Sequence, residues 1–578
     1  MAKISCGERD ITWGKWIYEN RDFVLTDVIS ICSFLQQPPS AAKAKLLGIW
    51  VMWLTASSCP IIRDKSSRAI SLLGLHSAFY VYELVILAKV VDDPYVLERV
   101  LAATYALALR IVRETNAEAK NALLTFSKQF FSGLEETVLW SFRNNVFIQQ
   151  YTLGLLFLIR ENIGPVDAPL INLDMAKQSR NLPQIINPEI ISQAGEHSLN
   201  SDFCNYVLGY LLPDWSTYNF TNSDYLELKT RLIKIMLSLG YDFEGMSPID
   251  ASIRRYPYSG SHAIKVERLG KKYSWMAYFE LVGQSVVHCE SRFREIGRDA
   301  HATIDPTFPD APRKISLNDT RVLFSNLDLE EWLEAGNSLD VANFEQMFSY
   351  EIFGDFIVLD GTVLVRDYNT DRELYASLRT FLVDENNADA LCEYLESSSA
   401  RDILDLPDIP VGYLQYYGEL PFQKIDPIYP NNSLSFLGNI DTGSGKSVVN
   451  FKIPVQKYHW EKYHSTENDV SNFVLPSPEL FESMHITSLS KTFELFDEFE
   501  SVGMALAIVD RFDESCGDLF ILKKVVAEKY LKATQQNLVF YVEGRRDVRS
   551  LDYESSRPLA HIYSQGLNEF RVVLKLSC

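Results

Sequence analysis

Residues that break helices are unevenly distributed along this 578-residue chain. The first 160 residues contain only six of the 27 glycines and four of the 23 prolines. Because glycine and proline mark turns and end helices, this part of the chain is predicted to be mainly helical and the remainder rich in turns. The charge changes at the same place, since the first 160 residues have a net charge of +3 and the rest −24.

The first 160 residues are predicted to form short helices that follow one another closely. In the clearest, VDDPYVLERVLAATYALALRIV, Asp92 or Asp93 can cap the free amides and Pro94 suits the first helical position. Its apolar surface is too wide for a helix that is covered on one side only. Stacked antiparallel helix pairs would cover it, so we expect a HEAT- or armadillo-like α-solenoid. No strict repeat period is present, and an irregular helical bundle is the alternative. The expected helices cover residues 22–36, 40–56, 61–74, 77–90, 94–113, 116–131 and 135–160.

Three regions are expected, with an α+β fold overall. Residues 1–160 form the helical repeat-like domain. Residues 161–300 form a loop-rich helical middle region, with helices at 223–239, ended by Gly240, and at about 268–288. Residues 301–578 form a mixed α/β domain.

The C-terminal domain contains alternating strand and helix patterns. Asp360-Gly361 lies between two β-branched runs and is typical of a two-residue hairpin turn. Thr370 and Glu373 fit a capping box for a helix that reaches about Leu382. Further helices are expected at 387–398 and 520–534, and strands at 504–510, 538–543 and 570–576.

Composition excludes several classes of protein. Hydrophobic residues at 47% and charged residues at 23% are ordinary globular values. The overall charge of −21 disfavours nucleic-acid binding, because phosphates would repel the chain. Eight scattered cysteines without a C-x-x-C pair are typical of a reducing cytosol. The apolar stretch at 46–62 is too short to span a membrane and contains Pro60. We therefore expect a cytoplasmic protein that does not contact membranes.

A glycine-rich segment at 438–447 partly resembles a phosphate-binding loop. The first glycine of that motif would stand at position 440, which is Ile440. The loop must also lead into a helix, whereas VVNFKIP reads as a strand that follows it. A glycine-rich hairpin or surface loop is the favoured interpretation, and no cofactor is expected. Nucleotide binding at Gly443 to Ser447 is kept as an alternative.

No catalytic or metal-binding motif can be assigned. His459 and His464 lie near Glu461 and Glu467, but they lack the paired spacing of a zinc site. No G-x-S-x-G nucleophile motif is present. The chain is therefore expected to be non-enzymatic. The alternative is an enzyme whose site is built from dispersed Asp, Glu and His residues of the C-terminal domain.

One basic cluster in an acidic region is a candidate binding surface. It includes cations at the start of an expected helix, where the helix dipole disfavours them. Such a cluster can bind an anion or an acidic partner protein. Alternatively, the cations pair locally with Glu267, Glu280 or other nearby acids. The members of the cluster are Arg254, Arg255, Arg268, Lys271 and Lys272.

Several blocks of the sequence, taken in order, resemble a series of sequence blocks found in a known class of proteins. They are VDDPYVLERVLAATYALAL, ERLGKKYSWMAYFELVG, ATIDP, YHWEKYHSTENDVS and LFILKKVVAEKYL followed by VFYVEG. In this order, and over residues 60–545, they resemble the C-terminal regions of large bacterial ATP-binding proteins of the STAND or NACHT type. These proteins act in antiviral defence and include the AVAST type.

This resemblance implies a sensor or scaffold role in a bacterial cytoplasmic system. It implies a protein partner, either an upstream ATPase or effector or a phage protein. The chain begins at a methionine with no ATPase before it. We therefore expect a split partner, a truncated relative or a separate protein that keeps only the recognition part. No catalytic residue is implied, because the matched blocks contain none that can be assigned.

Overall fold

The computed structural model describes the chain as two units, which we treat one by one. The first unit contains residues 1–308, 413–430 and 460–467, and the second contains residues 309–412, 431–459 and 468–578. The boundary expected at residue 160 falls inside the first unit and stays a prediction. The residues described are 4–113, 115–134, 137, 139, 142, 144–167, 188–199, 203–212, 219–255, 266–288, 313–316, 356–367, 372–397, 411–413, 437–441, 448–459, 472–477, 480, 488–489, 494–496, 501–509, 515–550, 563–564 and 570–576.

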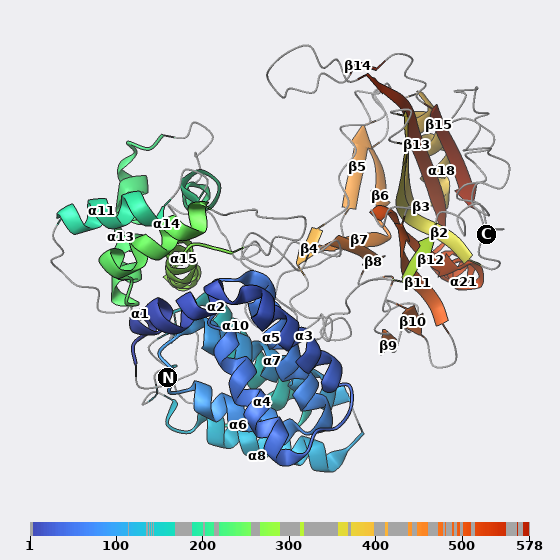
Figure 1. Ribbon diagram of the computed structural model, residues 1–578. Helices are drawn as coiled ribbons and strands as arrows, with labels where there is room; N and C mark the ends of the chain where they lie inside the picture. The colour runs from blue at the N-terminus through green and yellow to red at the C-terminus, as the bar shows by residue number, and fades with distance from the viewer. Residues whose placement is uncertain are drawn as a thin grey trace. The chain divides into compact units, whose positions relative to one another are not determined.

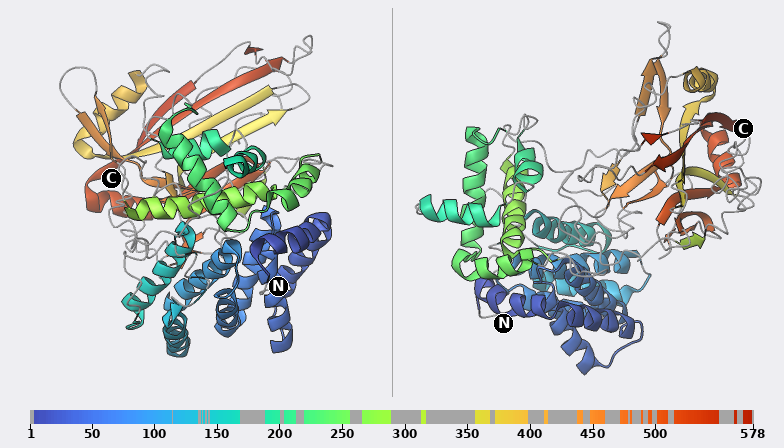
Figure 2. Two further views of the ribbon diagram at one scale, coloured as in Figure 1. Left: turned by 90° about the vertical axis from the view of Figure 1, so that its left-hand side faces the viewer. Right: turned by 45° about the horizontal axis from the view of Figure 1, so that its top comes forward.

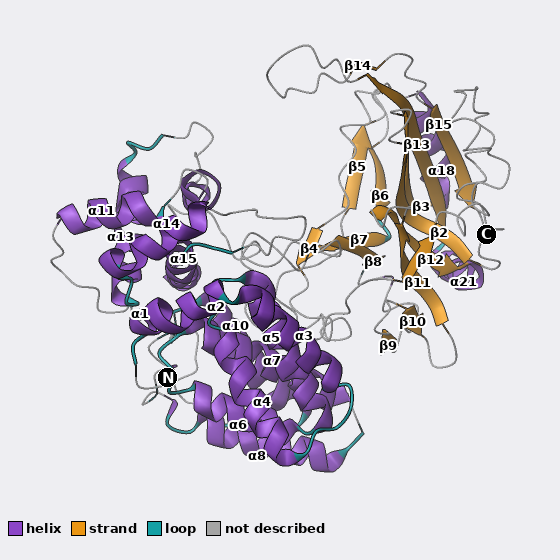
Figure 3. Ribbon diagram, viewed as in Figure 1, coloured by secondary structure: helices purple, strands orange, loops and turns teal. Residues whose placement is uncertain are grey.

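The described part of the first unit is helical (Figures 1 and 3). None of the described helices has both the length and the apolar character needed to cross a membrane. The helices before residue 163 are α1 (Cys6–Arg9), the π-helix η1 (Asp10–Gly14), α2 (Lys15–Glu19), α3 (Arg21–Phe34), α4 (Ala41–Leu54), α5 (Pro60–His76), α6 (Ala78–Ala88), α7 (Pro94–Arg113), α8 (Ala117–Phe131) and α10 (Val146–Asn162).

Helices α3 to α10 lie in two rows. In one row α3, α5, α7 and α10 contact one another in turn, and in the other α4 contacts α6 and α6 contacts α8. Figure 2 shows these helices side by side. Helix α7 lies between neighbours from both rows, and all its residues except Arg110 and Arg113 are buried. This agrees with its wide apolar surface in the sequence.

A second group of helices follows, and α15 connects it to the first. It packs against α10, α11, α13 and α14. At the α10 contact, Gly283 lies directly against the backbone of Asn144, so a Cβ at this position would meet the Asn144 carbonyl oxygen and lie 2.9 Å from the Val146 nitrogen. The group contains α11 (Pro188–Ser198), the π-helix η4 (Cys204–Leu208), the 3-10 helix η5 (Gly209–Leu211), α13 (Ser223–Ser238), α14 (Phe243–Arg255) and α15 (Leu269–His288).

The second unit is built on a sheet with the strand order β14-β13-β3-β2-β12-β11-β10-β9, to which β1, β5, β6 and β15 also pair. All its described pairs are antiparallel except β1 with β11. A smaller sheet contains β4, β7 and β8. The strands are β1 (Arg313–Ser316), β2 (Phe356–Asp367), β3 (Arg372–Asp384), β4 (Val411–Tyr413), β5 (Leu437–Asp441), β6 (Val448–Lys452), β7 (Val455–His459), β8 (Asn472–Pro476), β9 (Ser488–Leu489), β10 (Glu494–Phe496), β11 (Ser501–Val509), β12 (Ser515–Lys523), β13 (Gln536–Ser550), β14 (Tyr563–Ser564) and β15 (Phe570–Leu576).

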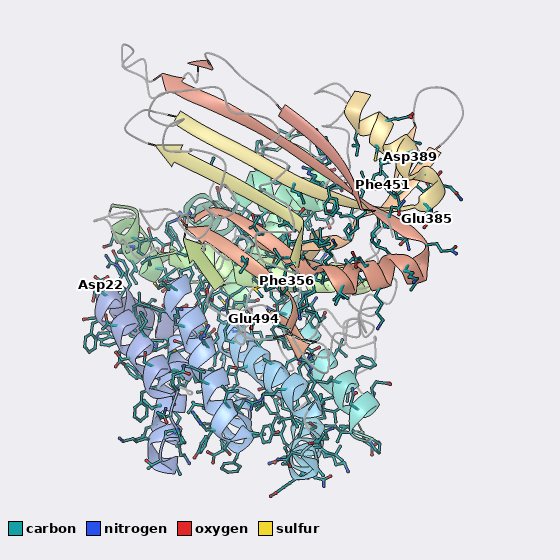
Figure 4. All side chains as sticks on the ribbon, turned by 90° about the vertical axis from the view of Figure 1, so that its right-hand side faces the viewer. Asp22, Phe356, Glu385, Asp389, Phe451 and Glu494 are labelled. Carbon is teal, nitrogen blue, oxygen red and sulfur yellow. The ribbon has the colours of Figure 1, made fainter. Side chains whose placement is uncertain are left out.

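Two helices pack on this sheet, α18 (Glu385–Ser397) and α21 (Lys524–Thr534). The sheet interior is mainly aliphatic, and it includes the rings of Phe381 and Phe451, which meet edge to face with 5.0 Å between their centroids. Glu385 and Asp389 of α18 are exposed (Figure 4). The molecule is therefore α+β, with a helical N-terminal region followed by a C-terminal region that is mainly antiparallel sheet.

Two local predictions in this unit are wrong. Asp360-Gly361 is no hairpin turn, because β2 continues through it with a bulge opposite β12. Gly361 is required there by close packing, since a Cβ would meet the Leu519 side chain. Thr370 lies outside the described residues, and Glu373 begins no helix because residues 372–384 form β3, which pairs with both β2 and β13.

Most other predicted elements are confirmed. Pro94 is the first residue of α7, and Asp93 accepts a hydrogen bond from the Tyr95 amide at 3.0 Å, as expected for a cap. Gly240 follows α13 with φ of 93°. Within the expected helix at 135–160, α10 begins at Val146, where Asn145 caps the amides of Phe147 and Ile148. The expected helix at 520–534 begins at Lys524, since β12 continues to Lys523. The helices between residues 6 and 19 were not predicted.

The Gly283 contact yields a test of the packing of α15. Gly283→Ala should destabilise the first unit by about 2 kcal/mol, because the new methyl group meets backbone that cannot move aside cheaply. Because this unit has more than 300 residues, the thermal midpoint should fall by about 3 °C, measured by far-ultraviolet circular dichroism. Gly164→Ala is the control, since its nearest neighbour is a Leu124 methyl at 3.4 Å. Equal midpoints for the two variants would contradict this account.

Candidate functional site

Of the five residues of the predicted basic cluster, the structure describes the side chains of Arg268, Lys271 and Lys272. Lys272 is completely buried, so it contributes nothing to a surface. Lys271 is 27% exposed and its ammonium group lies 3.1 Å from the carboxylate of Glu267, which agrees with local pairing. Arg268 is half-buried. Arg254 and Arg255 end α14, and their side chains lie outside the described residues.

Lys272 is the centre of a buried ion network. Its Nζ donates to both carboxylate oxygens of Asp10, at 2.9 and 3.0 Å, and to the Ala56 carbonyl oxygen at 2.7 Å. It also lies 3.7 Å from Asp93 Oδ2, and Arg9 Nη2 lies 3.6 Å from the same oxygen. These two cations and two carboxylates compensate one another in charge, as buried ions must.

Local structure places each of these charges. Ser5 and Glu8 form a capping box that begins α1 and leads into Arg9 and Asp10. Asp93 caps α7, so its position is fixed by the start of that helix. Lys272 lies in the first turn of α15. The network therefore joins three segments that are far apart in the sequence.

Cys6 and Tyr273 border the network. The Tyr273 hydroxyl donates to Cys6 Sγ at 3.3 Å, and Cys6 Sγ lies 3.5 Å from Asp93 Oδ2. Burial and the nearby carboxylates raise the pKa of the Cys6 thiol well above its ordinary value. Burial also raises the pKa of the Tyr273 phenol. Because the thiolate is the reactive form of cysteine, Cys6 is a poor nucleophile in this environment.

The pKa of Lys272 is set by two opposed effects. Burial alone would lower it, but attraction to Asp10 and Asp93 outweighs burial and raises the pKa above its ordinary value. A lysine that serves as a general base needs a lowered pKa. Lys272 holds its proton and acts here as a structural cation.

A second buried ionic group lies between α5 and α7. Arg99 Nη1 donates to Asp64 at 2.6 Å, and its Nε lies 3.3 Å from Glu98. The Arg63 guanidinium lies over the Tyr95 ring, 4.5 Å from its centroid. These contacts hold α5 against α7.

In the part of the chain that the structure describes, no group of three or more His, Cys, Asp or Glu residues could hold a metal ion.

The described residues also form a groove on the row of α4, α6 and α8. These three helices are labelled in Figure 1. Its volume is about 1140 Å³, and it is lined by these three helices together with the C-terminal ends of α5 and α7. Tyr82 of α6 stacks on Phe126 of α8 with 4.1 Å between ring centroids. This stacking fixes the position of α6 beside the α8 wall of the groove.

The groove exposes large apolar side chains. Helix α6 has the sequence AFYVYELVILA, in which Glu83 is the only charged residue. Phe79 is 60% exposed, Leu87 is 42% exposed, and Leu75 and Ile86 are also exposed. All of them line the groove. A contiguous exposed apolar patch is unusual for a soluble protein and typically marks an interaction site.

The charges that line the groove are balanced. Lys45 and Arg110 are the cationic side chains, and Glu83 and Glu118 are the anionic ones. Lys45 and Glu83 lie 4.0 Å apart at the surface. The lining therefore offers apolar area without an excess of either charge.

The glycine-rich segment of the second unit belongs to a hairpin. Strands β5 and β6 pair antiparallel on either side of it, with Asp441 opposite Val448. This confirms the hairpin interpretation, and the strand that follows replaces the helix that a phosphate-binding loop would need. Residues 442–447, including Lys446, lie outside the described residues, as do His464 and Glu467.

The exposed face of α6 was missed from the sequence. A helix was expected at 77–90, but no exposed apolar face was predicted for it. The apolar sequence of this helix was the signal that could have shown the face, because a helix this rich in apolar residues must be covered on every side.

A scan against models of known protein families finds no match for the chain, and a search of curated proteins finds no relative.

Removing the central cation should strongly destabilise the first unit. Lys272→Met leaves Asp10 and Asp93 buried without their main partner, and breaking a buried pair costs about 3–5 kcal/mol. Lys15→Met is the control, because Lys15 is half exposed and its pair with Glu19 contributes about 0.5 kcal/mol or less. Thermal unfolding monitored by circular dichroism measures both. Adding Asp10→Asn to Lys272→Met should restore part of the loss, and further destabilisation by it would contradict the network.

The same network predicts the response to alkali. Because the folded state raises the pKa of Lys272, its stabilising contribution is complete below the ordinary lysine pKa of 10.5 and is lost as the pH rises beyond it. The thermal midpoint should therefore fall more steeply between about pH 10 and about pH 12 in the parent chain than in Lys272→Met. Parallel pH profiles for the two proteins would show that Lys272 has no such role.

Proposed function

We propose that this chain is a non-enzymatic protein-interaction protein, a sensor or scaffold, and that its helical unit binds a partner protein through the groove on α4, α6 and α8. The observation that carries the proposal is the exposure of Phe79, Ile86 and Leu87 in one apolar groove. Water would be released from this area on binding, which is the main favourable term in protein association.

The buried charges support this assignment. Lys272 and Arg99 each lie in a separate group of buried ions, and within each group cations pair with carboxylates from other helices or segments. The thiol of Cys59 is buried and its pKa is raised to about 12, so it is not activated for nucleophilic chemistry. These buried titratable groups of the first unit thus serve the helix packing, and we assign recognition to the exposed apolar residues.

We further propose that the two rows form a HEAT-like α-solenoid. Each helix from α5 to α7 contacts both the preceding and the following helix in sequence. Each of these three also contacts the next helix of its own row. Alternation between two rows is what stacked helix pairs produce, and solenoids use the resulting extended surfaces to bind proteins.

The biological setting that we propose is a bacterial cytoplasmic antiviral-defence system. It rests on the resemblance of the sequence blocks to the C-terminal regions of STAND-type defence proteins. The partner would then be an upstream ATPase or effector, or a phage protein.

The experiment is affinity capture of the tagged chain from host cells, with and without phage infection. Phe79→Glu should reduce recovery of a specific partner by about tenfold or more, because it places an unpaired charge in the contact. Phe23→Glu is the matched control, since Phe23 is 68% exposed on α3 outside the groove lining. A partner that the two variants recover equally, or no partner in either condition, would refute the proposal.

A further inference from the structure

We propose that the occupant of the groove is an amphipathic α-helix of two to three turns from another protein, bound by its apolar face. This inference rests on the proposed function and specifies the chemistry of the partner. Three features of the described residues support it: the arrangement of the walls, the size of the groove and the balance of its charges.

The walls of the groove are themselves helices in one row. Helix α6 has 11 residues and lies between α4 with 14 and α8 with 15. Phe79 and Ile86 are seven residues apart, so they lie on one face of α6, and Leu87 extends that face. The α8 wall combines the small residues Ala119 and Ala122 with the larger Phe126 and Gln129. Large side chains that project from α6 can pack between the side chains of a bound helix, as ridges pack into grooves.

The size of the groove fits a short helix. An α-helix with a diameter of about 10 Å has a cross-section of about 80 Å². A volume of about 1140 Å³ therefore holds about 14 Å of helix, or about nine residues. This length brings two or three apolar residues of the partner onto α6.

The balanced charges of the groove lining favour the apolar face of a protein over a nucleic acid or an anionic lipid. The lining has two cationic and two anionic side chains, so it offers no excess positive charge to a nucleic acid or to anionic lipid. Lys45 with Glu83 and Arg110 with Glu118 instead supply both signs of charge beside the apolar floor. An amphipathic helix carries polar groups on both sides of its apolar stripe and complements this arrangement.

Site-specific photocrosslinking in host cells tests the inference. The full chain carries the photoreactive residue in Leu87→p-benzoylphenylalanine, and a second chain carries it in Val525→p-benzoylphenylalanine. Val525 is 61% exposed on α21 of the second unit and serves as the control position. Crosslinked material is digested, and the attached segment is identified by mass spectrometry. Circular dichroism of both variants establishes that they are folded.

The inference is supported if position 87 captures a protein segment with apolar residues at i, i+3 or i+4, and i+7, and position 525 does not. A synthetic peptide of that segment should then bind the parent chain about tenfold more tightly than it binds Phe79→Glu. Capture of an extended or loop segment would overturn the inference but leave the proposed function intact. Capture of lipid alone, or no capture above the level at position 525, would overturn both.

Discussion

The contact between Lys272 and the carboxylates of Asp10 and Asp93 is the interaction on which the helical unit depends. It places the first turn of α15, the N-terminal segment and the start of α7 at one point in the interior. Each of these charges would be costly to bury alone, and each is tolerated because the others are present. The packing of the N-terminal segment and the packing of α15 therefore depend on each other. The two belong to the same core although they are more than 250 residues apart in the sequence.

Charge and apolar area are arranged in an uncommon way in this unit. Lysine and arginine side chains usually lie at the surface, yet Arg9, Arg63, Arg99 and Lys272 are completely buried. Large apolar side chains, by contrast, lie exposed on α6. The ionic groups fix the packing of α5 and α7, on which the row of α4, α6 and α8 packs. Because α5 and α7 are held in one arrangement, that row can present a preformed groove, which reduces the entropy that a partner must lose on binding.

The helix starts and ends that neighbouring residues determine could be predicted from the sequence. Asp93 and Pro94 mark the start of α7, and Gly240 the end of α13, because caps and terminators act within one turn. Predictions failed where distant strands decide the outcome. Asp360-Gly361 has the composition of a turn, but pairing on both sides of β2 keeps it extended. Glu373 lies in β3 for the same reason.

The candidate site was only partly predictable, since the sequence around Lys272 shows a cation but not the distant Asp10 with which it pairs in the interior.

We propose above that the apolar face of α6 binds a protein partner. Hydroxyl-radical footprinting of the chain, alone and in complex with the partner captured from host cells, tests it most directly. Oxidation of Phe79, Ile86 and Leu87 should fall sharply in the complex, while oxidation of Phe23 should be unchanged. Unchanged oxidation at all three α6 positions in a stable complex would contradict it.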